Sequence, residues 1–287
     1  MKDTCGNKHI LVISQYFYPE SFRINDICQE WVKRGHRVTV VTGIPNYPQG
    51  KFYEGYDYTH KRNEIWNDIE IIRLPIKPRK TGAIHLSLNY LSFVFEGWKW
   101  IKSTNLDADS VFIYEVSPMT QALVGVWYAK KFKVKCVLYV TDLWPENVEI
   151  VLKTRNRLLL GLIGKMVDYI YRNSNHILTS SQSFVEKIKR RGVDESKLFY
   201  WPQYAEDFYK KVDRKKKLEI PDDGIANLTF AGNIGTAQGL DVLVKTAEIL
   251  KARKIQVRFN IIGNGRYEND LNRDRLPDRR ELWQGKK

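Results

Sequence analysis

Residues 9–42 read HILVISQYFYPESFRINDICQEWVKRGHRVTVVT, and this stretch decides the fold class. Its first run, residues 9–14, is short, apolar and rich in β-branched side chains, as in a buried parallel strand. Apolar residues then recur at helical spacing up to Lys33-Arg34-Gly35, a basic and glycine signal for a helix C-terminus. A second apolar run fills residues 37–42. Strand, helix and strand in succession predict a βαβ unit.

The same alternation continues far along the chain. Further strand-like runs occupy residues 69–74, 111–114, 136–141, 176–179 and 198–201. Helical apolar patterns separate them, and these are carried by residues 84–98, 119–126 and 159–170. Repeated strand and helix periods predict an α/β fold with an open, mostly parallel sheet covered on both faces.

A domain boundary is expected between residues 203 and 224. Residues 210–217 (KKVDRKKK) form a dense charge run, which is either a solvated linker or a helix face. The turn signal PDDG follows at residues 221–224. Strand, helix and strand patterns then restart at 227–231, 240–250 and 257–262. The sequence predicts two Rossmann-like domains, residues 1–205 and residues 206–287.

The second of these domains is expected to be incomplete. Only 82 residues follow Ala205, from 287 minus 205, whereas domains cluster near roughly 100–150 residues. Residues 274–287 also lose the strand and helix rhythm.

Composition and charge limit the partners. Lys and Arg number 47 against 33 Asp and Glu, for a net charge of +14, which favours nucleic acid, anionic membranes or phosphorylated substrates. The three cysteines, Cys5, Cys28 and Cys136, are far apart without metal-ligand spacing, as in a reducing cytosol. The first eight residues lack the apolar core of a signal peptide, and apolar runs of membrane-crossing length are absent from the sequence.

Several catalytic classes are disfavoured by missing motifs. The segment after the first strand, residues 15–23 (QYFYPESFR), lacks the Gly-x-Gly-x-x-Gly that brings a backbone close to a dinucleotide pyrophosphate. A nicotinamide oxidoreductase is therefore a minor alternative. The sequence also contains no P-loop, no Gly-x-Ser-x-Gly elbow and no metal-binding His cluster.

Two glycine turns follow the strands of the second domain. Residues 230–241 read FAGNIGTAQGLD and lead from a strand into a helix, where free N–H groups and the helix dipole favour an anion. Tight packing of strand against helix is the alternative explanation. A second turn, residues 262–265 (IGNG), ends the next strand. Since ligands of open α/β sheets bind beyond the carboxyl ends of strands, both turns are predicted to face one site.

With these segments in place, the chain resembles glycosyltransferase family 4, especially the branch that transfers N-acetylated amino sugars such as fucosamine in surface-polysaccharide synthesis. Both glycine turns carry the resemblance, together with residues 15–20 (QYFYPE), 34–38 (RGHRV), 42–50 (TGIPNYPQG) and 141–146 (TDLWPE). These segments span residues 9–271 in the expected order.

The resemblance implies a GT-B enzyme that binds the acceptor in its first domain and a nucleotide-sugar, UDP-linked, in its second. Such enzymes retain anomeric configuration and need no metal or cofactor. Backbone amides and polar or cationic side chains would stabilise the charge on the departing diphosphate. On this basis four residues approach the diphosphate and two shape the nucleotide-base pocket: Gly232, Asn233, Gly235 and Gln238, then Gly263 and Gly265.

Asp142 is the candidate catalytic residue, because it ends a first-domain strand and could orient or deprotonate the acceptor hydroxyl. An N-cap or turn role before Trp144 is the alternative. Three further residues are assigned to the acceptor side: Glu20, Arg23 and Asn46. Arg23 meets an acceptor phosphate or a surface carboxylate, and Asn46 belongs to a rigid Pro-Asn-Tyr-Pro loop that lines the acceptor site or fixes a turn.

Two departures from the family pattern matter. Asn233 and Gln238 occupy the positions where many members carry an Arg and a Lys, as in the aminosugar branch. The pair of glutamates that holds the donor sugar and ribose would lie beyond Lys287. A truncated, inactive chain that binds only acceptor or partner is therefore the alternative function.

The expected partners are a nucleotide-sugar and a glycan or polyprenyl-linked acceptor. Helical residues 84–103 and 157–172 combine apolar stripes with basic side chains, as in helices on an anionic membrane, although packing on the sheet is the favoured explanation for either helix alone. The aromatic pattern does not favour nucleic acid. We expect a cytoplasmic protein that associates with the inner face of the membrane.

Overall fold

The computed structural model describes residues 6–80, 82–152, 156–205, 209–210, 221, 223–235, 238–263, 265, 267–268 and 271. Contacts divide the chain into two units, Met1–Tyr204 and Ala205–Lys287, beside the expected boundary at residue 205. Of the basic run 210–217 only Lys210 is described, and the tail 274–287 lies outside the described residues.

The first unit contains an eight-stranded sheet in the order β3-β4-β2-β1-β5-β6-β7-β8. Every pairing is parallel except that of β3 with β4. The mostly parallel sheet confirms the predicted fold class. The strands are β1 (His9–Ile13), β2 (Arg37–Gly43), β3 (Asn63–Trp66), β4 (Ile69–Leu74), β5 (Ser110–Glu115), β6 (Lys135–Val140), β7 (His176–Thr179) and β8 (Leu198–Tyr200).

The position of β1 creates a topological switch point. In register, Val12 of β1 lies opposite Val40 of β2 on one side and Phe112 of β5 on the other. The chain therefore leaves β1 toward one half of the sheet and later returns to build the other half. In such sheets the loops after the central strands diverge at the carboxyl edge and leave room for a ligand.

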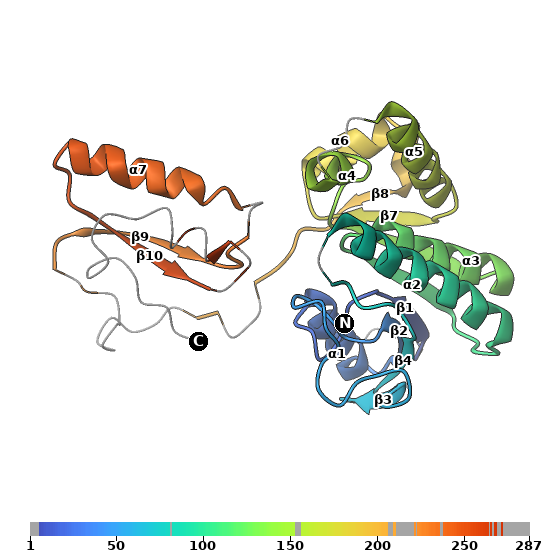
Figure 1. Ribbon diagram of the computed structural model, residues 1–287. Helices are drawn as coiled ribbons and strands as arrows, with labels where there is room; N and C mark the ends of the chain where they lie inside the picture. Colours follow the sequence, from blue (N-terminus) through green and yellow to red (C-terminus); the bar gives the residue numbers. More distant parts are fainter. Residues whose placement is uncertain are drawn as a thin grey trace. The chain divides into compact units, whose positions relative to one another are not determined.

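Both faces of this sheet are covered (Figure 1). Because side chains alternate along a strand, Leu11 and Ile13 face the core that contains α2, α3, α5 and α6, whereas Val12 packs in the core of α1. The helical segments of this unit are α1 (Arg23–Lys33), α2 (Ala83–Ser103), η1 (Met119–Gln121), α3 (Ala122–Phe132), α4 (Glu146–Leu152), α5 (Arg157–Arg172), α6 (Gln182–Lys189) and η2 (Glu195–Lys197).

Strand β3 was not predicted from the sequence. It joins β4 through Asn67 and Asp68, whose φ angles of 48° and 60° are those of a two-residue type I′ hairpin turn. The hairpin is held by Arg73, a fully buried side chain that forms a 2.7 Å ion pair with Glu64 of β3. Arg73 also donates to the Tyr18 carbonyl at 2.8 Å and so ties the edge of the sheet to the loop after β1.

The second unit repeats the βαβ order that was predicted. Strands β9 (Ala226–Ala231) and β10 (Val257–Ile262) pair in parallel, and α7 (Asp241–Ala252) connects them. Figure 1 shows α7 lying along this two-stranded sheet. Five buried side chains form its core: Ile234, Leu240, Val244, Ile261 and Leu271.

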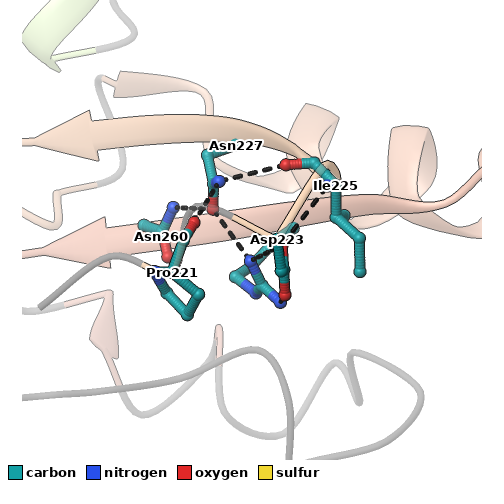
Figure 2. Close-up of polar contacts among 6 residues, drawn as sticks. Pro221, Asp223, Ile225, Asn227 and Asn260 are labelled. Carbon is teal, nitrogen blue, oxygen red and sulfur yellow. Dashed lines mark hydrogen bonds and ion pairs between the residues drawn. The ribbon is translucent and has the colours of Figure 1, made fainter.

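Polar side chains fasten the entry to β9 (Figure 2). The Asn227 amide donates to the Pro221 carbonyl at 3.0 Å, and Asn260 of β10 donates to Asn227 at 3.1 Å. Asp223 pairs with Arg258 at 2.7 Å. These contacts join the preceding turn to both strands.

Packing of α3 on the sheet gives a stability prediction. A Cβ added at Gly125 would lie 2.4 Å from Cγ1 of the fully buried Ile113, so Gly125→Ala should lower the free energy of unfolding by about 1–3 kcal/mol. At Gly161 in α5 an added Cβ meets nothing within 4 Å, so Gly161→Ala should raise it by about 0.5–1 kcal/mol. Urea unfolding followed by tryptophan fluorescence compares the two. Equal stabilisation by both substitutions would contradict the packing described.

Candidate functional site

The loops after β1, β2, β5 and β6 meet at the carboxyl edge of the first sheet. Gln15, just after β1, does not belong to a phosphate-binding loop. It links neighbouring elements of the fold by hydrogen bonds. Its N–H donates to Gln121 of η1 at 2.7 Å, and its side-chain amide donates to Asn89 of α2 at 2.7 Å. All three of these side chains are buried. These buried hydrogen bonds thus fix the carboxyl edge of the sheet, which supports the more exposed residues of the site.

Asp142 lies at this edge, directly after β6, and is half-buried. Its Oδ2 accepts a hydrogen bond from the Ser117 N–H at 2.7 Å, which joins the loops that follow β5 and β6. Among the described residues its Oδ1 forms no hydrogen bond. Ser117 Oγ in turn accepts from Trp144 Nε1 at 3.1 Å and from Asn147 Nδ2 at 3.3 Å. The carboxylate is therefore oriented by one oxygen and has the other available for a hydroxyl donor.

Glu115, which the sequence analysis missed, forms a hydrogen bond with the backbone of Asp142. It is fully buried at the end of β5, and its Oε2 accepts the Asp142 N–H at 3.3 Å. Burial, followed by the charge of Asp142, raises the pKa of Glu115 well above its ordinary value. Glu115 therefore holds a proton more readily than an ordinary carboxyl group. The signal for it in the sequence was a single carboxylate at the end of the apolar run VFIYE.

Glu20 and Asn46, both assigned to the acceptor side, are brought together and buried. Glu20 Oε1 accepts the N–H groups of Asn46 at 2.7 Å and Tyr47 at 2.6 Å. Its Oε2 is buried and has no partner in the described part of the chain. Burial raises the pKa of Glu20 to about 7, partly offset by these backbone N–H donors. Because Glu20 and Asn46 are buried and bond within the loop after β2, these two residues set the conformation of that loop.

A cation and several aromatic rings line this edge without having been predicted. The Arg79 N–H donates to Asn46 Oδ1 at 2.9 Å, and its guanidinium lies 5.3 Å from the ring centre of Tyr47. Tyr47 also packs against Tyr16, with ring centres 5.5 Å apart. Burial raises the pKa of Tyr90, and the charges of Arg79 and Asp142 act on it in opposite directions. Tyr90 therefore lies within the electrostatic range of both charged groups.

Arg23 and His36 have different positions. Arg23 begins α1, donates to the Tyr204 carbonyl at 2.6 Å and lies 5.1 Å from the centre of the Tyr204 ring. His36 precedes β2 at the opposite, amino-terminal edge of the sheet, where its Nδ1 accepts the Lys8 N–H at 3.2 Å. His36 therefore lies in the connection between α1 and β2, away from the carboxyl edge.

The two glycine turns of the second unit pack directly on each other. A Cβ at Gly263 would lie 1.8 Å from the carbonyl oxygen of Gly232, and one at Gly265 would lie 2.1 Å from that of Ile234. The Gly232 N–H donates to the Ile262 carbonyl at 2.9 Å. Only glycine permits this approach, so the turns after β9 and β10 form one continuous backbone surface.

Asn233 and Gln238 flank Gly235 on this surface. A Cβ at Gly235 would lie 2.7 Å from Gln238 Oε1 and 3.0 Å from Asn233 Nδ2. Six residues predicted to bind the donor are thus neighbours in the described structure: Gly232, Asn233, Gly235, Gln238, Gly263 and Gly265. Uncharged amides and backbone groups are available there to an anionic ligand.

The described residues include neither a cluster of metal ligands nor a membrane-crossing helix. Within the described ranges, no three or more His, Cys, Asp or Glu side chains gather where they could hold a metal ion. Over the same residues, none of the helices combines the length and hydropathy needed to cross a membrane.

Comparison with solved structures defines the class of protein. HepE of Anabaena, in a complex with UDP and glucose, superposes with a TM-score of 0.56 at 11% identity, over 93% of this chain and 65% of HepE. The likeness is one of fold. The fold is the α/β GT-B architecture of glycosyltransferases.

Sequence comparison then identifies the family. The model of the glycosyl transferase 4-like domain matches residues 21–202, so the chain belongs to the glycosyl transferase 4-like family. WcaI of Escherichia coli K12, named for glycosyl transfer in colanic acid biosynthesis, is 24% identical over 277 residues, which are 89% of this chain and 66% of WcaI. WbjE of Pseudomonas aeruginosa, which carries a glycosyltransferase name, is 24% identical over 53% of this chain and 38% of WbjE. The chain spans less than two thirds of either relative.

Burial of Glu20 gives a pH prediction. Its folded pKa of about 7 exceeds the ordinary 4.5, so between these values the folded protein keeps a proton that the unfolded chain releases. The free energy of unfolding must then fall as pH rises through this window, by roughly 3 kcal/mol in all. Glu20→Gln should remove about that much of the fall between pH 4.5 and 8, as measured by urea unfolding.

The exposed Glu54→Gln is the matched control and should leave the pH profile unchanged. Glu115 contributes in the same direction to all three proteins and cancels in the comparison. An identical decline in the wild type and Glu20→Gln would show that Glu20 titrates normally.

Proposed function

We propose that this protein is a retaining glycosyltransferase that moves a sugar from a nucleotide-sugar to an acceptor hydroxyl. The observation that carries the proposal is the placement of Asp142 in a chain of this family. Ser117 holds Asp142 at the carboxyl edge of the sheet through Oδ2, and Oδ1 forms no hydrogen bond with the described residues. A carboxylate so placed can accept the proton of a hydroxyl nucleophile.

In the proposed reaction the donor is held by the glycine turns of the second unit. The diphosphate would accept hydrogen bonds from backbone N–H groups and from Asn233 and Gln238. As the bond between the anomeric carbon and the diphosphate oxygen breaks, that oxygen takes the electron pair and these donors stabilise its charge. The acceptor oxygen forms the new bond to the anomeric carbon, and its proton passes to Asp142. The nucleotide diphosphate leaves.

The finer assignments rest on the sequence resemblance and on the relatives. The complex of HepE with UDP and glucose supports a UDP-linked donor. WcaI, named for colanic acid biosynthesis, supports a role in polysaccharide synthesis. The resemblance to the aminosugar branch favours an N-acetylated aminosugar as the transferred group, with no metal or cofactor, and a glycan or polyprenyl-linked acceptor at the inner face of the membrane.

Exposed apolar side chains on α2 and α5 support association with a membrane surface. Basic side chains accompany them: Lys102 lies 3.6 Å from the centre of the Trp98 ring, and Lys165 is exposed on α5. Apolar contacts beside lysines match an anionic bilayer.

Replacement of the proposed base tests the acceptor half of the reaction. Asp142→Asn should lower kcat for transfer from UDP-N-acetyl aminosugars by about 10²–10⁴-fold, because the amide cannot accept the hydroxyl proton. Affinity for UDP should not change. The exposed Asp26→Asn on α1 is the matched control and should keep full activity. A kcat of Asp142→Asn within threefold of the wild type would exclude this role.

Direct binding tests the donor half. Gly263→Ala places a Cβ within 1.8 Å of the Gly232 oxygen, so it should abolish UDP binding measured by calorimetry. Asn233→Ala leaves the turns intact and should weaken UDP binding by about tenfold, through loss of one hydrogen bond. Lys251→Ala, exposed on α7, is the control. If UDP and UDP-sugars do not bind the wild-type chain, the proposal fails.

A further inference from the structure

An apolar groove runs between α2 and α5 in the first unit. Its volume is about 400 Å³, which falls within the roughly 300–1,000 Å³ of small-molecule sites. Aliphatic side chains dominate its walls, chiefly Leu86 and Leu91 from α2 and Leu159, Leu162 and Met166 from α5.

Part of the groove wall belongs to the site already described. Ser117, Tyr90 and Asn147 line it. Ser117 donates to the Asp142 carboxylate, and Asn147 donates to Ser117 Oγ. Burial and, to a smaller extent, the charge of Asp142 raise the pKa of Tyr90. A molecule whose hydroxyl lies at Asp142 would therefore have the mouth of an apolar channel beside it.

The rim of the groove is strongly exposed. Leu91 is 59% exposed and Leu162 is 66% exposed, although both are aliphatic and both line the groove. Aliphatic side chains that face each other across an open channel gain stability when another apolar group covers them. The arrangement fits a long hydrocarbon chain, which can enter between the helices.

A positive charge that acts on Tyr90, one of the residues lining the groove, distinguishes an anionic lipid from a neutral one. Arg79 and Tyr90 act on each other electrostatically, and in the described part of the chain no ion pair joins Arg79 to a carboxylate. Its backbone N–H donates to Asn46 Oδ1, and its guanidinium lies against the Tyr47 ring and within the influence of Tyr16 and Tyr90. A guanidinium without an acidic partner is suited to a phosphate group.

We propose that the α2–α5 groove binds the hydrocarbon chain of a lipid phosphate acceptor, with Arg79 at its phosphate. This rests on the proposed function, since it names the substrate class for the Asp142 site. The lipid would place its headgroup sugar toward Asp142 and its chain toward the open rim, where the chain leaves the protein.

Binding of farnesyl phosphate to the full chain, measured by calorimetry, tests the proposal. Farnesyl phosphate should bind at least about a hundredfold more tightly than methyl phosphate, because only the former has a chain to bury. Leu91→Gln and Leu162→Gln should each weaken its binding by roughly tenfold. Both positions are exposed, so the variants should keep the fold, which thermal unfolding checks.

Two matched substitutions separate the groove from a general membrane surface. Ile84 of α2 is 76% exposed and Leu158 of α5 is 83% exposed, and neither lines the groove. Ile84→Gln and Leu158→Gln should leave farnesyl phosphate binding within twofold of the wild type. Equal losses in all four variants, or in none, would overturn the groove as the binding site.

The phosphate contact has its own test. Arg79→Gln should weaken binding of farnesyl phosphate and leave binding of farnesol unchanged. If both ligands weaken equally, Arg79 does not hold the phosphate. If Leu91→Gln and Leu162→Gln instead turn a dimer into a monomer in sedimentation experiments, the groove belongs to a second copy of the chain and the proposal is wrong.

Failure of this inference can be told apart from failure of the proposed function. Farnesyl phosphate binding requires neither donor nor catalysis, so Asp142→Asn should retain it. Sugar transfer to acceptors that is indifferent to chain length would leave the transferase intact and reject the groove. Chain-dependent binding of farnesyl phosphate without any binding of UDP-sugars would support the groove and reject the transferase.

Discussion

The hydrogen bond from the Ser117 N–H to the Asp142 carboxylate joins the ends of β5 and β6, and the arrangement of the whole edge follows from it. It fixes one carboxylate oxygen of Asp142. Through its hydroxyl, Ser117 also accepts from Trp144 and Asn147, so the same residue positions the start of α4 and the inner wall of the groove. Parallel pairing of β5 with β6 brings these two loops side by side, which a hairpin connection would not achieve.

Two buried carboxyl groups support this edge at a cost in stability. Glu115 and Glu20 are both removed from water, and burial raises the pKa of each. Each also accepts backbone N–H groups that set the path of a loop, at Asp142 and at Asn46. A protonated, buried carboxyl can hold a loop without placing a second charge beside the Asp142 carboxylate. In this interpretation stability is traded for the geometry of a site.

Hydrophobic periodicity predicted most of the fold, because long buried strands and amphipathic helices have distinct repeats. The hairpin of β3 was missed, since its four residues are only partly buried and its turn depends on the left-handed φ angles of Asn67 and Asp68. Asp142 and the glycine turns could be predicted as site candidates because they follow strands. Arg79 was not, because it reaches the edge through a contact with Asn46, 33 residues away, that no local pattern reveals.

The central claim is that the acceptor binds at the carboxyl edge of the first sheet, beside Asp142. Photolabelling with a diazirine-bearing farnesyl phosphate, followed by peptide mass spectrometry, tests this most directly. We expect labels on residues 86–91 and 159–166, and their loss when unlabelled farnesyl phosphate competes. Specific labels confined to residues outside these two helices would contradict it.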